Sequence, residues 1–112
     1  MSVVAVLGGG GMGTVMSRIF ARRGAEVRLW VRDPEQAETI ARERINERYL
    51  PGIAIPDDVR VTSDLVHAVA GPALMVAAIP SAYLRDTLAP HADLIRQRAP
   101  RIPVLSVVKG ME

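Results

Sequence analysis

The sequence predicts an α/β fold with a doubly wound parallel sheet, five strands in the spatial order 3-2-1-4-5. Three observations predict it. Short apolar runs alternate with helix-like segments along all 112 residues, which is the pattern of repeated strand–helix–strand units. The apolar runs show little polar alternation, as expected for strands buried on both faces of a parallel sheet. A glycine-rich turn joins the first run to the first helix, where such sheets bind ligands.

The first half of the chain contains two strand–helix pairs. Residues 3–7 form an uninterrupted apolar run, the expected first strand. The helix that follows has apolar residues at helical spacing and ends in arginines just before Gly24, because cations and a glycine favour a helix C-terminus. A second strand is expected at 27–31. The second helix begins at a capping Asp33 followed by proline, and is expected to run through Ile45.

The second half continues the alternation. Residues 48–58 contain prolines and a glycine, so we expect an ordered loop there rather than an element. The remaining elements are expected as a strand at 59–62, a short helix at 65–70 capped by Ser63 or Asp64, a strand at 74–79, a helical stretch at 83–98 interrupted at Pro90, and a strand at 102–108. No repeat or linker divides the chain, so residues 1–112 are expected to form one domain.

Composition excludes several classes of function. The chain has no cysteine, which excludes disulfides, cysteine-ligated metals and cysteine nucleophiles. Its net charge is +2 and aromatic residues make up 4 %, so no nucleic-acid partner is expected. No apolar run approaches the ~20 residues that span a bilayer, and we expect a cytoplasmic protein without membrane insertion. His67 and His91 are interpreted as surface residues, and no metal site or catalytic residue is identified.

The glycine turn carries the strongest functional signal. Gly8, Gly10 and Gly13 form a G-x-G-x-x-G pattern that follows a buried strand and opens a helix, the context of a Rossmann-like dinucleotide site. The first glycine permits the tight turn, the second lets a pyrophosphate approach the backbone, and the third lets the helix pack closely. Gly11 and Met12 complete the candidate cofactor-binding turn. A Walker phosphate loop is excluded, because it needs Lys and then Ser/Thr after the last glycine, and Thr14 and Val15 stand there instead.

The end of the second strand bears on the choice of cofactor. Asp33 stands at the distance where an acid would hold the ribose of NAD, but it is better explained as a helix cap. Arg32 directly ends the strand, and its guanidinium could pair with the 2′-phosphate of NADP. NADP or NAD is therefore the expected cofactor, with NADP favoured by Arg32. The alternative for Arg32 is a solvated surface arginine.

The ends of the fourth and fifth strands supply further candidates. Ligands in this fold lie outside the carboxyl ends of the strands, where Pro80, Ser81 and Lys109 are expected. Pro80 would lie beside the nicotinamide half of the cofactor. The Lys109 ammonium would face a phosphate or a substrate oxygen. The alternatives are a helix cap at 80–81 and an ordinary lysine near the end of the chain.

Five segments occur in a fixed order along the chain: V-A-V-L-G-G-G-G-M-G-T at 4–14, E-V-R-L-W-V-R-D-P at 26–34, R-Y-L-P-G at 48–52, A-I-P-S at 78–81 and S-V-V-K-G-M-E at 106–112. Together they resemble the N-terminal cofactor domain of bacterial NAD(P)-dependent glycerol-3-phosphate dehydrogenase. The resemblance covers the whole chain. The glycine motif is shared by many dehydrogenases, whereas the other segments are more specific as a set.

The resemblance implies reversible hydride transfer between NAD(P)H and dihydroxyacetone phosphate, a phosphorylated triose, giving sn-glycerol 3-phosphate for phospholipid synthesis. It implies cofactor contacts from the glycine turn, Arg32, Tyr49 and Lys109, with Lys109 also contacting the substrate. Two departures stand out. Gly11 and Met12 replace the serine and aromatic residue usual in the family, and the family's C-terminal helical domain, with its catalytic lysine, has no counterpart in these 112 residues.

We therefore expect a cofactor-binding fragment that does not turn over substrate alone and that could form a homodimer. One alternative is a non-enzymatic NAD(P)-binding module that senses redox state. Another is the front half of a different two-domain reductase, of the ketopantoate or 6-phosphogluconate type. The segments at 48–52 and 109–112 argue against that second alternative.

Overall fold

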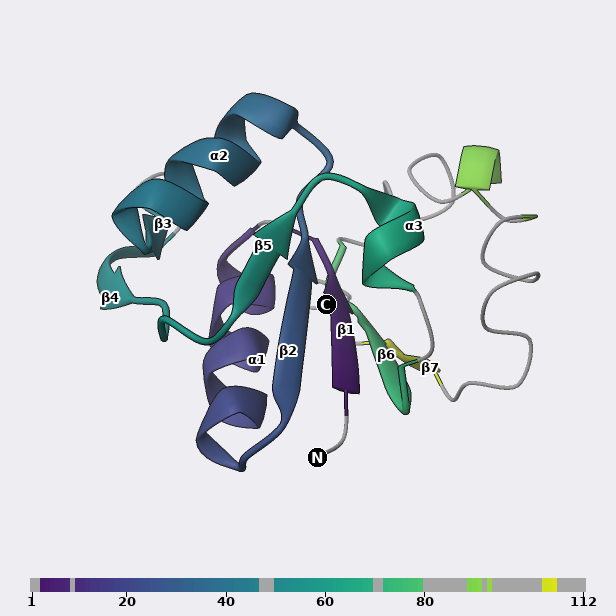
Figure 1. Ribbon diagram of the computed structural model, residues 1–112, viewed down its shortest axis with the longest axis horizontal. Helices are drawn as coiled ribbons and strands as arrows, with labels where there is room; N and C mark the ends of the chain where they lie inside the picture. The colour runs from purple at the N-terminus through teal and green to yellow at the C-terminus, as the bar shows by residue number, and fades with distance from the viewer. Residues whose placement is uncertain are drawn as a thin grey trace, which may run out of the picture.

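The computed structural model describes residues 3–8, 10–46, 50–69, 72–79, 89–91, 93 and 104–106, with side chains described for all of these except 46, 50–53, 91 and 104–106. A parallel sheet forms the centre of the molecule, with strand order β5-β2-β1-β6-β7 (Figure 1). The strands are β1 (Val3–Leu7), β2 (Glu26–Trp30), β5 (Arg60–Thr62), β6 (Leu74–Ala77) and β7 (Val104–Ser106). The doubly wound parallel class is confirmed, and the order of the described strands agrees with the expected one.

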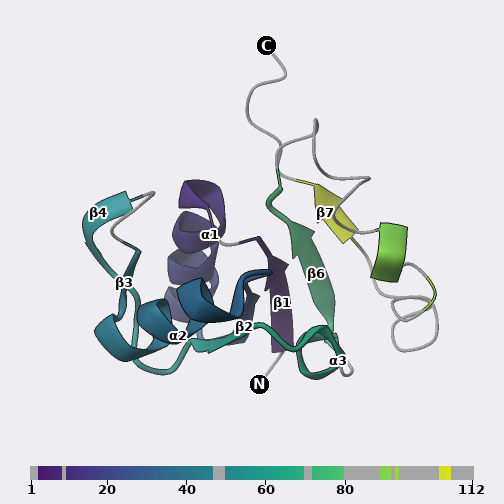
Figure 2. The same cartoon turned by 90° about the horizontal axis from the view of Figure 1, so that it is seen from above.

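Helices cover both faces of this sheet. They are α1 (Gly11–Arg22), α2 (Pro34–Glu43) and α3 (Leu65–Ala68). Figure 2 shows α1 and α3 on opposite faces. Alternate residues of β1 and β2 point to opposite faces, so Val6 and Leu29 join one buried cluster with residues of α1 and α2, while Leu7 and Trp30 join another with residues of α3.

Local signals fix the helix ends as expected. Gly24, just past α1, has a φ of +89°, a conformation that glycine adopts without steric cost. The Asp33 carboxylate accepts a hydrogen bond from the Glu35 N–H at 3.0 Å and caps α2. Asp64 likewise accepts from the Val66 N–H at 3.0 Å and caps α3. These bonds satisfy amide groups that a helix start leaves without intrahelical partners.

The end of α2 corrects one expectation. The helix does not continue through Ile45, because Arg44 adopts a left-handed conformation with φ of +58° and ψ of +26°. That conformation ends the helix and turns the chain, so Ile45 begins β3 (Ile45–Asn46). An apolar residue at helical spacing cannot reveal this turn, since the period survives one residue beyond the true end.

The expected loop at 48–58 is a second correction. It contains β4 (Leu50–Ala54), which pairs antiparallel with β3 to make a small separate sheet. The register shifts between Ile45 and Asn46, and this irregular short ladder tolerates proline because no long run of N–H donors is required. Proline and glycine therefore mark an irregular hairpin here, rather than the absence of strands.

The other elements lie within three residues of their expected bounds where they are described. The helix α3 ends at Ala68, and residue 70 lies outside the described residues. Of the helical stretch expected at 83–98, the structure describes a 3-10 turn, η1 (Ala89–His91), and Asp93 alone. Ile19, an apolar residue of α1, is 41 % exposed. No helix in the described parts of the chain is long and apolar enough to cross a membrane.

Candidate cofactor-binding site

The glycine turn leaves β1 in the middle of the sheet, between β2 and β6. Gly8 has a φ of +132°, and a Cβ atom at this position would lie 2.6 Å from the Ala78 carbonyl oxygen. The Gly8 N–H also donates to the Trp30 carbonyl oxygen at 2.9 Å. A side chain at position 8 would therefore be excluded by both conformation and space. This is the first of the three roles expected of the motif.

Gly13 allows the closest packing in the turn. A Cβ atom on Gly13 would overlap the Gly8 carbonyl oxygen, so the first turn of α1 can rest directly on the chain leaving β1. Two hydroxyls support the same turn. Thr14 Oγ1 donates to the Gly10 carbonyl at 3.2 Å, and Ser17 Oγ donates to the Gly13 carbonyl at 2.8 Å. Gly13, Thr14 and Ser17 are all buried, so the start of α1 is held rigidly on the sheet.

Gly10 is open where the other two glycines are enclosed. It is the N-cap residue of α1, with φ of −84° and ψ of −168°, and no side chain caps the helix. A Cβ atom on Gly10 would meet nothing within 4 Å. The first turn contains no acidic residue, so no carboxylate of that turn competes for its N–H groups or for the positive end of the helix dipole. This arrangement suits a bound phosphate group.

The end of β2 leads to two candidate residues, Arg32 and Asp33. Trp30 is buried, and its indole Nε1–H donates to the Ser63 carbonyl at 3.1 Å. Arg32, two residues on, is exposed. Asp33 is engaged as the cap of α2, as the sequence predicted, and the exposed Arg32 guanidinium precedes it at the strand end. An anionic group that reaches this position could pair with that guanidinium.

Several expected site residues lie outside the described residues. These are Tyr49, Pro80, Ser81 and Lys109. The described structure therefore brings together the glycine turn and the end of β2. The expected contributions of the other four remain predictions from the sequence. His67 is exposed, in agreement with its interpretation as a surface residue.

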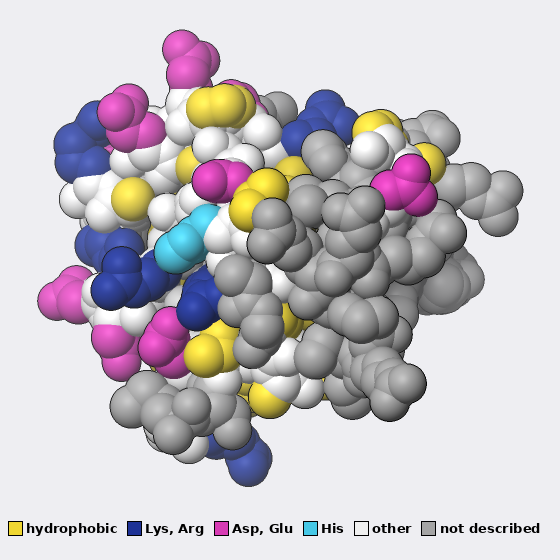
Figure 3. Space-filling model, turned by 45° about the vertical axis from the view of Figure 1, so that its right-hand side comes forward, with side chains coloured by type: hydrophobic (Ala, Val, Ile, Leu, Met, Phe, Trp, Pro, Cys, Tyr) yellow, Lys and Arg dark blue, Asp and Glu magenta, His cyan; other side chains and the backbone are white. Residues whose placement is uncertain are grey.

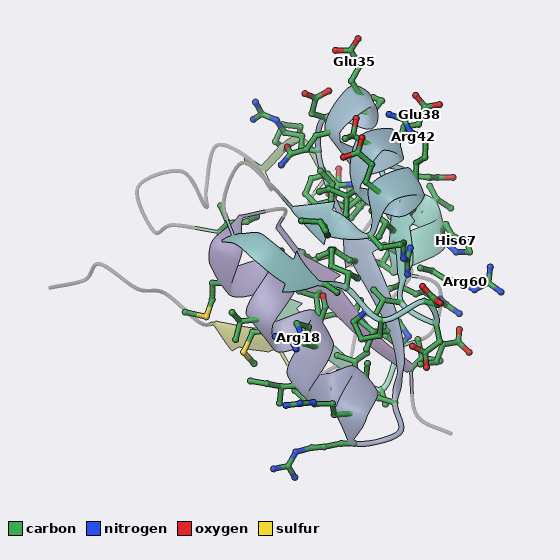
Figure 4. The ribbon with its side chains drawn as sticks, turned by 90° about the vertical axis from the view of Figure 1, so that its left-hand side faces the viewer. Arg18, Glu35, Glu38, Arg42, Arg60 and His67 are labelled. Atoms are coloured by element: carbon green, nitrogen blue, oxygen red, sulfur yellow. The ribbon has the colours of Figure 1, made fainter. Side chains whose placement is uncertain are left out.

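An open groove of about 950 Å³ lies elsewhere, along the edge strand β5. Arg44, Arg60, Asp64 and His67 contribute to its lining, and Figure 4 shows Arg60 and His67 extending toward the same side of the molecule. On the face shown in Figure 3, the described basic and acidic side chains are interspersed. The groove therefore offers a mixture of charges, unlike the acid-free start of α1, and it is the weaker candidate for a dinucleotide site.

The sequence did not reveal the hydrogen bonds that long side chains make to residues far away along the chain. The bond from Trp30 to Ser63 crosses 33 residues of chain, and Arg44 bonds to the carbonyls of Pro56 and Val59. The acceptors are backbone carbonyls, which every residue possesses. No residue type at positions 56, 59 or 63 could therefore signal these contacts in the sequence.

Comparison with known proteins identifies the fold and the family. A protein-family model, described as the NAD-dependent glycerol-3-phosphate dehydrogenase N-terminus, matches residues 3–112 of this chain. The chain belongs to this family. A glycerol-3-phosphate dehydrogenase [NAD(P)+] of Pseudomonas entomophila is 45 % identical over 109 residues, which are 97 % of this chain and 31 % of that protein. One of Chlorobium phaeobacteroides is 41 % identical over 109 residues, 97 % of this chain and 32 % of that protein.

Solved structures agree with this assignment. The crystal structure of glycerol-3-phosphate dehydrogenase from Coxiella burnetii has a TM-score of 0.83 at 27 % identity, covering 97 % of this chain and 33 % of the other. The Saccharomyces cerevisiae enzyme has a TM-score of 0.79 at 26 % identity, covering 100 % of this chain and 34 % of the other. A ketopantoate reductase from Ralstonia eutropha has a TM-score of 0.70 at 24 % identity, which shows a shared fold alone.

The resemblance found in the sequence motifs is thus confirmed at the level of the family. The chain spans about a third of the length of the curated relatives that it matches. The comparison favours the glycerol-3-phosphate dehydrogenase family over the ketopantoate type of reductase. The assignment concerns the N-terminal domain of the family, and the candidate dinucleotide fingerprint lies at the first turn of this domain.

Proposed function

We propose that residues 1–112 are the cofactor-binding domain of an NAD(P)-dependent glycerol-3-phosphate dehydrogenase. The observation that carries the proposal is the start of α1: an uncapped, acid-free helix N-terminus, open in front of Gly10 and fixed behind by Gly8 and Gly13. An NAD(P) diphosphate fits this arrangement, because backbone N–H groups and the helix dipole favour an anion that can approach without meeting a side chain. Membership of the family supports the same function.

The residues of the chain have distinct roles in this proposal. The N–H groups of Gly10, Gly11, Met12 and Gly13 would hold the diphosphate, and Arg32 would pair with the 2′-phosphate of NADP. The resemblance and the sequence supply the other expected contacts. Tyr49 would contact the cofactor, Pro80 would lie beside its nicotinamide half, and Lys109 would contact both cofactor and substrate. When bound, the nicotinamide supplies or accepts the hydride that interconverts dihydroxyacetone phosphate and glycerol 3-phosphate.

The domain is proposed to bind the cofactor without catalysing the reaction alone. Reduction of a ketone needs a proton donor positioned near the carbonyl oxygen, and the resemblance places the family's catalytic lysine in a helical domain that has no counterpart in these 112 residues. We further propose that the domain acts in the cytoplasm, as the lack of cysteine suits a reducing compartment, and that it could dimerise.

A parallel titration of the chain with NADPH and NADH tests the proposal. The single tryptophan, Trp30, is buried at the end of β2 next to the turn, so energy transfer from it to the reduced nicotinamide reports binding. Saturable binding of NADPH that is tighter than that of NADH, with the difference lost in Arg32→Ala, is expected. Binding of neither cofactor to the folded chain would overturn the proposal.

The Arg32 variant needs a matched control. Arg42 is an exposed arginine of α2 that pairs only weakly with Glu43, at 3.8 Å. Its replacement by alanine changes the net charge equally, so Arg42→Ala is expected to leave the preference for NADPH unchanged. If both variants lost the preference for NADPH over NADH equally, the effect would come from net charge, and Arg32 would not be assigned to the 2′-phosphate.

Substrate turnover separates the enzyme from a redox-sensing module. The longer protein that contains this domain is expected to oxidise NADPH with dihydroxyacetone phosphate, whereas a sensing module would bind the cofactor without turnover. The 112-residue chain alone is expected to show none. If the isolated chain turned over substrate as fast as the longer protein, the proposal that the catalytic residues lie outside this domain would be wrong.

A further inference from the structure

Thr14 holds the peptide unit that joins Gly10 to Gly11 at the start of α1. Its backbone N–H and its side-chain Oγ1 both donate to the Gly10 carbonyl oxygen, each at 3.2 Å. Thr14 is fully buried, so its hydroxyl is kept from solvent, where it would otherwise bond to water. The Gly10 carbonyl is therefore fixed by two donors that come from one residue.

The Gly10 carbonyl belongs to the same planar peptide unit as the Gly11 N–H. None of the described peptide bonds is cis, and in a trans peptide the C=O and the N–H point in opposite directions. The carbonyl accepts from Thr14, one turn further along α1, so the Gly11 N–H points the other way, out of the helix start. The bonds that fix the carbonyl thereby also fix the direction of this N–H.

A second buried hydroxyl extends the same line of hydrogen bonds. Ser17 Oγ donates to the Gly13 carbonyl at 2.8 Å. That carbonyl shares a peptide unit with the Thr14 N–H, which in turn bonds to the Gly10 carbonyl. The bonds therefore run from Ser17 through two peptide units to the Gly11 N–H at the open end of the helix. In such a chain each bond polarises the next, so both hydroxyls strengthen the last donor.

Helix stability alone does not explain a hydroxyl at position 14. Threonine is a weaker helix former than alanine, and a side-chain bond to the carbonyl four residues earlier competes with the helix rather than supporting it. Burial of a hydroxyl also costs free energy that its hydrogen bond must offset. A role at the open end of the helix accounts for a residue where packing alone would favour an apolar one.

We propose that Thr14 is a positioning residue for the cofactor diphosphate, because its hydroxyl aims and polarises the Gly11 N–H toward the bound anion. This inference rests on the proposed function, in which that N–H is one of the donors to the diphosphate. The open space in front of Gly10 lets an anion reach this donor. Since Thr14 is buried, its effect passes through the Gly10–Gly11 peptide unit rather than through direct contact with the ligand.

The test compares Thr14→Val with Thr14→Ser, each titrated with NADPH through Trp30 fluorescence under conditions where circular dichroism shows a folded chain. Valine has nearly the shape of threonine but no hydroxyl. It is expected to weaken NADPH binding about tenfold, the equivalent of one hydrogen bond in a line that ends on a charge. Serine keeps the hydroxyl, so Thr14→Ser is expected to bind within about twofold of the wild type. A serine variant as weak as the valine variant would overturn the inference.

Adenosine 2′-monophosphate separates positioning from a general loss of structure. It carries the 2′-phosphate of NADP and lacks the diphosphate, so it should pair with Arg32 without using the start of α1. Thr14→Val is expected to bind this probe as the wild type does, while its NADPH affinity falls. Equal weakening for both ligands would overturn the inference. Asp64→Ala, which removes the cap of α3, is the matched control and is expected to keep wild-type NADPH affinity. A similar fall in that control would assign the effect to stability and also overturn the inference.

The proposed function and this inference fail in different ways. If the folded wild-type chain binds no NADPH, both are overturned. If the wild type and folded Thr14→Val bind NADPH equally, the domain function stands and only the role of Thr14 is lost. If Thr14→Val does not fold, or the wild type does not bind the monophosphate, the amide resonances of the wild type decide. Saturation with NADPH should then move the Gly11 amide proton further than those of Met12 and Gly13, and an unmoved Gly11 amide would overturn the inference.

Discussion

The chain turns through positive φ at both Gly8 and Arg44, and the two turns are built in opposite ways. At Gly8 a side chain has no room, because a Cβ atom would lie 2.6 Å from the Ala78 carbonyl oxygen. At Arg44 the side chain is what completes the turn, through its bonds to Pro56 and Val59. The turn at Gly8 requires a residue without a side chain, whereas the turn at Arg44 is completed by a long cationic side chain.

This difference determines what each turn can do. The glycine turn exposes backbone N–H groups and leaves space beside Gly10, so a ligand can complete it. The Arg44 turn satisfies neighbouring carbonyls internally and anchors a hairpin. The first arrangement leaves room for a ligand, and the second holds the hairpin in place. Substitutions at the two turns should therefore separate stability from ligand affinity.

Gly13→Ala is expected to have the largest effect on stability. Its Cβ would overlap the Gly8 carbonyl, a backbone atom that cannot move aside without disturbing β1. We expect a loss of roughly 3 kcal/mol, at the upper end of the cost of overpacking, measured as the free energy of unfolding in urea. A variant with wild-type stability would show that α1 does not rest on the turn as described.

Gly10→Ala is expected to reduce binding rather than stability. Its Cβ meets open space, so the midpoint of unfolding should change little. The same methyl group would occupy the space through which the diphosphate approaches, and we expect NADPH affinity to fall about 100-fold, or ~2.7 kcal/mol. Fluorescence titration of the variant measures its NADPH affinity, and urea unfolding of the same sample measures its stability. An unchanged affinity would place the cofactor elsewhere.

Arg44→Ala tests the other turn by stability alone. It loses the bonds to two carbonyls and keeps the unfavourable backbone conformation, and we expect a destabilisation of about 2 kcal/mol. Arg44→Gly should be less destabilised by about 1 kcal/mol, because glycine tolerates the positive φ. Chemical unfolding measures both. If alanine were the more stable of the two, the described strain at Arg44 would be wrong.

Asp33→Ala is expected to have the smallest effect, a loss of about 1 kcal/mol from removal of the helix cap. Asp33→Asn should recover most of it, because the amide oxygen can still accept from the Glu35 N–H. Neither variant should weaken NADH binding by more than twofold if the aspartate is committed to the cap. A large, selective loss of NADH affinity would instead assign Asp33 to the ribose.

The features that the sequence predicted are those encoded by local residue types. Apolar runs identified the strands of the parallel sheet, Asp33 and Gly24 marked helix ends, and the three glycines marked the candidate cofactor-binding turn. The Arg44 turn and the β3–β4 hairpin could not be predicted in the same way. Their stabilising partners are backbone carbonyls 12 and 15 residues away, and a left-handed arginine follows from those distant contacts rather than from its intrinsic preference.

Chemical-shift mapping of the chain with NADPH tests the central claim most directly. The amide resonances of Gly10, Gly11, Met12 and Gly13 are expected to shift on saturation, since their N–H groups would bind the diphosphate. Resonances along the β5 groove, such as that of Arg60, are expected to stay in place. Shifts confined to the groove, with the amides at the start of α1 unchanged, would contradict the account.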